Sequence, residues 1–238
     1  LFNNVFVLAG GHKKNNMKRI LSVAMLLMLS LVLCAQEKDV TKFLGIPVDG
    51  SKAEMIRKLK AKGFMYDFKT DLLSGEFNGR KVKLSVVTNN DKVWRIMVQD
   101  DVYVNERSIQ IRFNDLCRQF ENNTKYMSIN EEQTLSDEED ISYEIAAHKK
   151  RYEAVFYQKP ATDFAEIIKE IVQSLAYKYN EEELANPTEE IKSEITELYF
   201  KDYISKKSVW FMISDYLGEY KILMYYDNGH NCANGEDL

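Results

Sequence analysis

The sequence is poor in the residues that break regular structure, with only 3 prolines and 10 glycines in 238 positions. Collagen-like and low-complexity chains need far more of either, and a hydrophobic content of 45% is that of a globular protein rather than a disordered one. Basic residues are in the minority. The formal net charge of -5 excludes the cationic footprint of a nucleic-acid binder. Because prolines and glycines are few, long stretches of the chain are free to form helices and strands around a sizeable core.

One apolar run near the N-terminus has the layout of a secretory signal peptide. Two basic residues precede an uncharged run over 20–33, and the small Ala35 stands before Gln36. The run is too short to span a bilayer, which takes about 20 apolar residues. We expect residues 17–35 to be a signal peptide cleaved between Ala35 and Gln36. We interpret residues 1–16 as a mis-assigned upstream extension.

Cys34 offers lipidation as an alternative to plain cleavage. A lipobox needs a small residue before its cysteine, and Leu33 stands there, so cleavage without lipidation is favoured. Loss of residues 1–35 removes four basic residues and no acidic one, which takes the net charge to -9. Such a chain repels nucleic acid and anionic membranes, and no later apolar run is long enough to span a membrane. The prediction is a periplasmic or secreted protein.

Two cysteines, Cys117 and Cys232, remain in the predicted exported chain. Export makes a disulfide between them chemically allowed. Cys117 falls on an apolar helix stripe, however, where a small buried side chain is the favoured interpretation. The sequence leaves their pairing open.

The first predicted unit, residues 43–100, consists of a helix and an antiparallel meander. Ser51 is placed to cap the helix, with an acidic residue three positions later. Alternating apolar residues then predict strands, and the Asn78-Gly79 pair predicts a tight hairpin. The last of these strands is expected to direct three residues to one face of the sheet: Trp94, Ile96 and Val98.

The second predicted unit, residues 101–160, repeats this plan. Asn105 is placed to cap a helix, and extended runs follow at 126–129, 141–147 and 151–158. The repetition is structural, without clear sequence identity between the units.

The third predicted unit, residues 161–238, contains two helices and a terminal hairpin. Thr188 is placed to cap the second helix, and the strands are expected at 208–214 and 220–227. The predicted class is therefore α+β, with two tandem helix-plus-antiparallel-meander units followed by two helices and a C-terminal β-hairpin. We expect one body, with the third unit on or beside the second.

Three segments carry a resemblance to known proteins: FLGIPVDG at 43–50, RFNDLCRQF at 112–120 and NGEDL at 234–238. On these, residues 43–238 resemble an uncharacterised exported protein family of Gram-negative gut anaerobes. The opening segment, short helix and meander resemble the β-lactamase-inhibitor-protein-like fold. The resemblance implies a fold and export from the cytoplasm. It implies no activity, because fold alone does not give function.

Few residues point to catalysis, a cofactor or a metal. His148 and His230 lack the spacing of metal ligands, and a Cys117–His148 dyad would place a thiolate on an apolar helix face. Six acids lie within 130–140, where a solvated insertion is favoured over hydrolytic carboxylates or a weak calcium loop. A small basic spot at 148–151 is suited to an acidic partner or simply to a charged turn. We predict no enzyme and no cofactor.

Aromatic residues in the third unit suggest a binding surface. Strand alternation assigns Val209 and its partners to the core and directs Trp210, Met212 and Tyr225 to the opposite face. Exposed Trp and Tyr are typical anchors for a protein or glycan partner, although a third-unit helix covering this face is slightly favoured over an exposed patch. The predicted function is partner binding in the envelope or outside the cell. The alternatives are a small envelope hydrolase using carboxylates and a structural envelope assembly factor.

Overall fold

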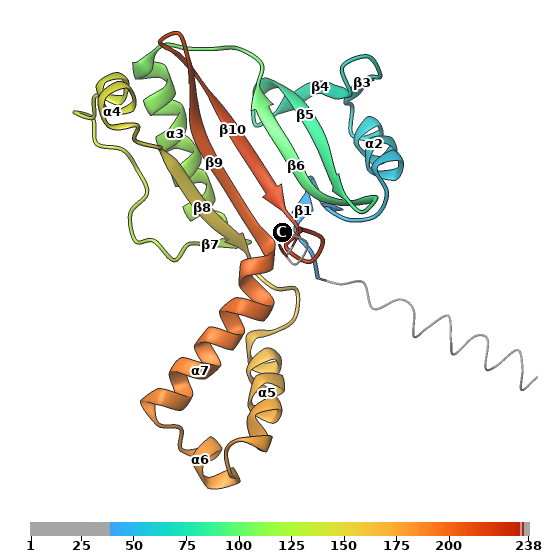
Figure 1. Cartoon of the computed structure of the whole chain (residues 1–238), viewed down its shortest axis with the longest axis vertical. Coiled ribbons are helices and arrows are strands. Elements are labelled where there is room, and N and C mark those ends of the chain that lie inside the picture. The colour runs from blue at the N-terminus through green and yellow to red at the C-terminus, as the bar shows by residue number, and fades with distance from the viewer. Residues whose placement is uncertain (1–38, 234, 236–238) are drawn as a thin grey trace, which may run out of the picture. The chain divides into compact units, whose positions relative to one another are not determined.

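The computed structural model describes residues 39–233 and 235, and Val40 onward forms a single unit (Figure 1). The predicted signal peptide, the cleavage site at Ala35 and Gln36, Cys34 and most of the 234–238 segment lie outside the described residues. Within the described part, the predicted α+β class and terminal hairpin are confirmed. No helix there is both long and apolar enough to cross a membrane.

One antiparallel sheet of eight strands runs through all three predicted units (Figure 1). Its order is β3-β4-β5-β6-β10-β9-β8-β7, so the terminal hairpin lies between the first and second units and joins them. The strands are β3 Met65–Asp67, β4 Leu72–Phe77, β5 Arg80–Asn89, β6 Lys92–Asp100, β7 Tyr126–Met127, β8 Glu153–Gln158, β9 Ser208–Tyr216 and β10 Glu219–Asp227. A separate small sheet pairs β1 Lys42–Phe43 with β2 Ile46–Pro47.

The helices begin where the sequence places capping residues. The α-helices are α2 Lys52–Ala61, α3 Glu106–Glu121, α4 Ile141–His148, α5 Phe164–Ser174, α6 Glu181–Ala185 and α7 Glu189–Tyr199. The side chains of Ser51, Asn105 and Thr188 each accept a hydrogen bond from a backbone N–H in the first turn, as predicted. A π-turn, Phe200–Ile204, and a 3-10 turn, Ser205–Lys207, connect α7 to β9.

The predicted hairpin turn at Asn78-Gly79 is present between β4 and β5. Both residues have positive φ, 50° and 70°, which is the backbone of a type I′ turn and explains the Asn-Gly pair. The turn fixes the register in which Leu73 lies opposite Leu84.

The main core lies between one face of the sheet and helices α2, α3 and α4. Side chains from β5, β6, β9 and β10 meet those of the helices in a single buried cluster, which includes Leu84, Ile96, Phe211 and Met224 from the strands and Leu59, Phe113 and Ile141 from the helices. We call this the inner face of the sheet.

Two predictions about this region were wrong, and each has a local cause. Residues 141–147 form helix α4 rather than a strand. Asp140 caps it, and Ile141 and Ile145, four residues apart, face the core together while Tyr143 is 57% exposed. The apolar alternation of this segment therefore fitted a strand only by coincidence.

Trp94 was expected to share one face of the sheet with Ile96 and Val98, but those two are buried and Trp94 is only half-buried. The register between β5 and β6 shifts at Val87, so Trp94 is the extra residue of a β-bulge. Val93 takes the buried position, and Arg95 returns to the outer face.

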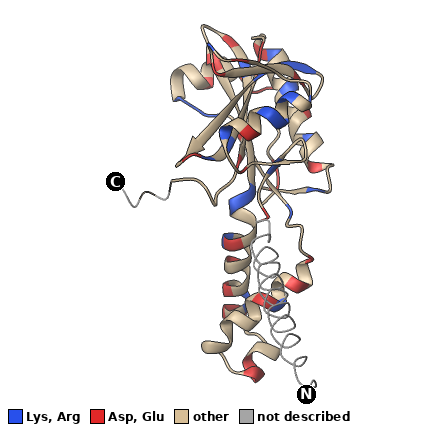
Figure 2. Ribbon diagram, turned by 90° about the vertical axis from the view of Figure 1, so that its right-hand side faces the viewer, with Lys and Arg blue, Asp and Glu red and all other residues tan. Residues whose placement is uncertain are grey.

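Helices α5 and α7 form a second, smaller hydrophobic cluster beyond the end of the sheet (Figure 1). Ile167, Ile171 and Leu175 are buried there against side chains of α7 such as Ile195 and Leu198. Segment 163–202 carries eleven acidic and four basic residues, many of them visible on these helices in Figure 2. The short helix α6 was not predicted, and it begins with a capping box formed by Asn180 and Glu183.

Candidate functional site

The face of the sheet opposite the core carries the residues that sequence alternation selected for binding. We call it the open face. Two cross-strand rows define it: Ser85–Met97–Tyr225–Trp210–Val155, and Lys83–Gln99–Leu223–Met212–Glu153. Nine of these ten side chains are half-buried, and Glu153 is exposed. The centre of the open face is therefore apolar, with hydrophilic residues at both ends of each row except at Val155.

The predicted residues Trp210, Met212 and Tyr225 are brought together here. Trp210 and Tyr225 are register partners on β9 and β10, and their rings stack with centroids 4.1 Å apart at 19°. Met212 lies opposite Leu223, one pair further along the same two strands. Partner binding by these residues stays a prediction.

Arg95 joins this aromatic pair from β6. Its guanidinium carbon lies 4.7 Å from the ring centroid of Tyr225, 5.5 Å from that of Trp210 and 4.2 Å from that of Trp94. A cation held over several rings is stabilised by the negative faces of their π-systems. Burial also raises the pKa of Tyr225, so this phenol stays neutral at physiological pH.

Asp227 holds the cluster in place. Its two carboxylate oxygens accept hydrogen bonds from Nε and Nη2 of Arg95, each at 2.6 Å, and one of them also accepts the Nε1–H of Trp210 at 2.9 Å. Thr41 donates its hydroxyl to the backbone carbonyl of Asp227. The indole donor is therefore already satisfied, and Trp210 offers a partner its apolar surface in a fixed orientation.

The open face is bounded at both ends. At one end the ring of Phe200 packs edge-on against Tyr157 of β8, with centroids 5.5 Å apart. At the other end Met212 borders a pocket of about 530 Å³ between α4 and the β9–β10 hairpin. Its lining includes three basic residues and one acidic residue together with apolar side chains: Lys149, Lys150, Arg151, Asp215, Ile145, Ala146 and Met212. We call it the basic pocket.

The acidic segment 130–140 is not the free insertion that the sequence suggested. Side chains of α3 hold it: Asn114 both donates to Leu135 O, at 2.8 Å, and accepts from Leu135 N, at 2.7 Å. Gln133 makes the same two-way contact with the backbone of Val155 on β8, at 3.0 and 2.7 Å. The segment is thus a strap that covers part of the edge of β8, and Gln133 acts there in place of a neighbouring strand.

One carboxylate of the strap, that of Glu139, is held by neighbouring side chains. Glu139 accepts hydrogen bonds from Lys150 and from the hydroxyl of Tyr152, and these contacts lower its pKa. A general acid in a glycosidase needs the opposite, a raised pKa. Glu139 therefore fits a structural role between the strap and β8.

Histidines and cysteines show no metal-binding arrangement in the described part of the chain, where no three potential ligand residues gather. His148 lies at the C-terminal end of α4, with Nδ1 2.9 Å from a carboxylate oxygen of Glu144. Cys117 is buried on α3, and burial raises its thiol pKa to about 12. It is not paired with Cys232, which is exposed.

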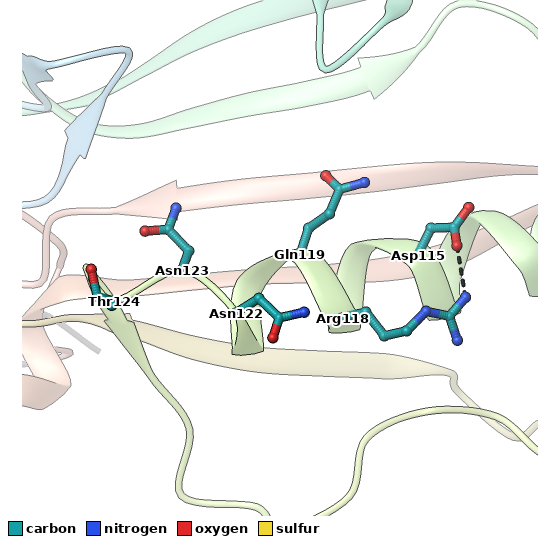
Figure 3. Close-up of a pocket in the computed structure, with 6 residues that line it drawn as sticks. All are labelled: Asp115, Arg118, Gln119, Asn122, Asn123 and Thr124. Atoms are coloured by element: carbon teal, nitrogen blue, oxygen red, sulfur yellow. Dashed lines mark hydrogen bonds and ion pairs between the residues drawn. The ribbon is translucent and has the colours of Figure 1, made fainter.

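A second hollow, of about 550 Å³, lies at the C-terminal end of α3 (Figure 3). Its lining is entirely polar: Asp115, Arg118, Gln119, Asn122, Asn123 and Thr124. Arg118 is paired with Asp115 at 2.7 Å, and Gln119 accepts a hydrogen bond from Asn78 at 2.8 Å. With no apolar floor and its main charges already paired, this hollow is a weaker candidate than the open face.

The sequence missed the contributions of Trp94, Arg95 and Asp227 to the site. The pairing of β6 with β10 places Arg95 opposite Asp227, beside Trp210, and the β-bulge sets Trp94 next to Arg95; neither feature is visible in local sequence patterns. No protein-family profile, curated protein or solved structure matches the chain. The resemblance to an exported family with a β-lactamase-inhibitor-protein-like fold therefore stays a prediction.

Proposed function

We propose that this chain is an exported, non-enzymatic binding protein that holds a protein partner on its open face. One observation carries the proposal: Trp210, Tyr225, Met212 and Leu223 form an apolar centre on the face of the sheet that lies away from the main core. On protein surfaces, apolar patches that are rimmed by polar residues mark interaction sites.

The composition of the open face suits a protein partner. Trp and Tyr carry a large share of the binding energy at interfaces, and Met is also enriched there. The contacts of Asp227 with Arg95 and Trp210 hold these side chains in place before any partner arrives, which lowers the entropy lost on binding.

A protein is favoured over a glycan because of how the rings lie. Sugars stack on a free aromatic face. Trp210 and Tyr225 already cover one face of each other, and the guanidinium of Arg95 lies close to both. Flat contact area across several strands remains available to a protein surface.

Export is the second element of the proposal. It rests on the signal-peptide layout of residues 17–35 and on the small Ala35 before Gln36. N-terminal sequencing of the protein recovered from the periplasm or medium is expected to begin at Gln36. A start upstream of residue 17 would contradict it, and a lipid-modified Cys34 would replace it with membrane anchoring.

Site-specific photocross-linking in cells tests the binding function directly. Benzoylphenylalanine in place of Met97, the register partner of Tyr225 on the open face, is expected to give a discrete adduct of higher mass. The same group in place of Tyr177, which is 86% exposed on the α5–α7 segment, serves as the control and is expected to give none. Mass spectrometry of the adduct identifies the partner and separates a second protein from a second copy of this chain.

Two variants of Trp210 test whether formation of the adduct depends on its aromatic side chain. Trp210→Ala is expected to weaken capture at Met97 by about tenfold, provided that its circular dichroism and urea midpoint show a folded chain. Trp210→Phe, which keeps a ring but lacks the N–H, is expected to retain most of the capture. Equal adducts at both probe positions, or none at Met97, would refute the proposal.

A further inference from the structure

We propose that the basic pocket receives an acidic segment of the partner protein, one in which carboxylates stand next to an apolar side chain. This inference rests on the proposed function, because the basic pocket continues the open face through Met212. It assigns a binding role to the basic residues of segment 148–151, which take no part in the apolar centre of the open face.

The backbone at the end of α4 forms the wall of the basic pocket. Lys149 has a left-handed conformation, with φ 56°, and its N–H bonds back to Ile145 O at 3.1 Å. Lys150 N bonds to Glu144 O at 3.2 Å, so the helix ends abruptly. Three consecutive basic residues, 149–151, then lead along the pocket toward β8.

Two of these three cations, Lys149 and Arg151, keep donors available. Lys149 has no carboxylate within ion-pair distance among the described residues, and its ammonium contacts only the carbonyl of Ala146, at 3.3 Å. Arg151 uses Nη2 to reach Glu153 at 3.0 Å, and a guanidinium has further N–H groups to offer. Lys150 is committed to Glu139. An incoming carboxylate therefore meets Lys149 first, with Arg151 beside it.

Part of the pocket lining is apolar, from Ile145, Ala146 and Met212, with two serines beside them. Outside the lining, the adjoining hairpin tip exposes Tyr216 (61%) and Leu217 (86%). The one acidic side chain in the lining is Asp215, on the hairpin side. The pocket thus offers cations on the α4 side and apolar contact beside them, which complements an acidic, amphipathic peptide.

Asp215 carries the charge opposite to that of the three cations. The test can therefore include one variant expected to strengthen binding of an acidic peptide as well as variants expected to weaken it. Lys149→Asn removes the least committed cation while suiting the left-handed backbone, since asparagine tolerates positive φ. Asp215→Asn removes the repulsion. Ala146→Phe fills the pocket from an exposed helix position. Lys169→Asn, an exposed lysine on α5, is the matched control for loss of one positive charge.

The probes are two short fluorescent peptides that differ only in charge, one with paired glutamates between leucines and one with paired glutamines. Fluorescence anisotropy with the chain from Gln36 onward is expected to show at least about tenfold tighter binding of the glutamate peptide at low salt. Lys149→Asn and Ala146→Phe are expected to abolish this preference, Asp215→Asn to increase it, and Lys169→Asn to leave it unchanged.

Three results would overturn the inference: equal affinity for both peptides, no binding of the glutamate peptide at millimolar concentration, or indifference to Lys149→Asn. Binding of phosphatidylglycerol vesicles that depends on Lys149 would also overturn it, in favour of a lipid headgroup. The Met97 cross-link separates the two proposals. If the Met97 adduct forms but the two peptides bind with equal affinity, only the proposed role of the basic pocket is refuted. If the adduct and the preference for the glutamate peptide are both absent, the proposed binding function is refuted as well.

Discussion

At the scale of single residues, the two cysteines of the predicted exported chain have opposite environments. Cys117 is buried on α3 with its thiol pKa raised to about 12, and Cys232 is exposed. The thiolate is the reactive form, so Cys117 is expected to be inert in the folded protein. Ellman's reagent at pH 8 is expected to label one thiol per chain from Gln36 onward, and a second only in denaturant. Two fast thiols would show that α3 does not cover Cys117, and none would reveal the Cys117–Cys232 disulfide that the structure lacks.

Glu139 makes stability depend on pH through its contacts with Lys150 and Tyr152. These contacts lower its pKa in the folded state, so it stabilises the fold above the ordinary carboxyl pKa and loses that effect as the pH falls through the folded value. Between about pH 5 and pH 3, the free energy of unfolding is expected to fall more steeply for the wild type than for Glu139→Gln.

The control for this pH experiment is Glu138→Gln, one residue away on the exposed side of the strap. It is expected to reproduce the wild-type slope in urea titrations at each pH. Identical slopes for all three proteins would mean that the contacts of Glu139 are lost in solution.

At the scale of elements, the strap depends on polar side chains along one face of α3. Gln110, Asn114 and Cys117, at successive turns, contact the backbone of residues 133–136. Asn114→Leu would leave both backbone groups of Leu135 without their partner. The expected loss in the free energy of unfolding is about 1–3 kcal/mol, measured by urea denaturation.

Ile111→Ala provides the control on the same helix, because Ile111 is 48% exposed. Its effect is expected to stay within about 0.5 kcal/mol. Hydrogen exchange at Val155, which Gln133 protects, is expected to rise in Asn114→Leu and not in Ile111→Ala. Equal stability of the two variants would show that the strap is not anchored through Asn114.

Elements that depend on local chemistry were predictable, and those that depend on distant partners were not. The caps at Ser51, Asn105 and Thr188 and the Asn78-Gly79 turn follow from side-chain and backbone preferences within four residues. The strap did not: its six acids indicated a solvated loop, while the amides that hold it come from α3. Segment 141–147 was ambiguous because its isoleucines fit both periods.

At the scale of the whole molecule, the two hydrophobic clusters differ in size. The main core draws on strands from β4 to β10 and on three helices, whereas the α5–α7 cluster has three buried members among the described residues. Small clusters with few buried contacts open at lower free energy. Amides of α5 and α7 are therefore expected to exchange hydrogen faster than those of β6 and β10 in native-state measurements. Equal protection would show that the α5–α7 segment unfolds only with the sheet.

The candidate site was predictable only in the part that depends on local alternation along the strands. Alternation along β9 and β10 places Trp210, Met212 and Tyr225 on one face without any knowledge of the sheet. The order of strands is set by pairing between distant segments, and only that order brings Arg95 beside them.

The central position of the terminal hairpin has a consequence for how the chain is made and moved. The strands β3 to β6 and the pair β7–β8 are not hydrogen-bonded to each other; both attach to β9 and β10. A chain that emerges from the ribosome or a translocation channel N-terminus first cannot close its sheet until residue 227 is free. The middle of the sheet is therefore the last part to be synthesised, and until then strands β3 to β6 and the pair β7–β8 lack the hairpin that joins them. In the export that we propose, translocation would precede closure of the sheet.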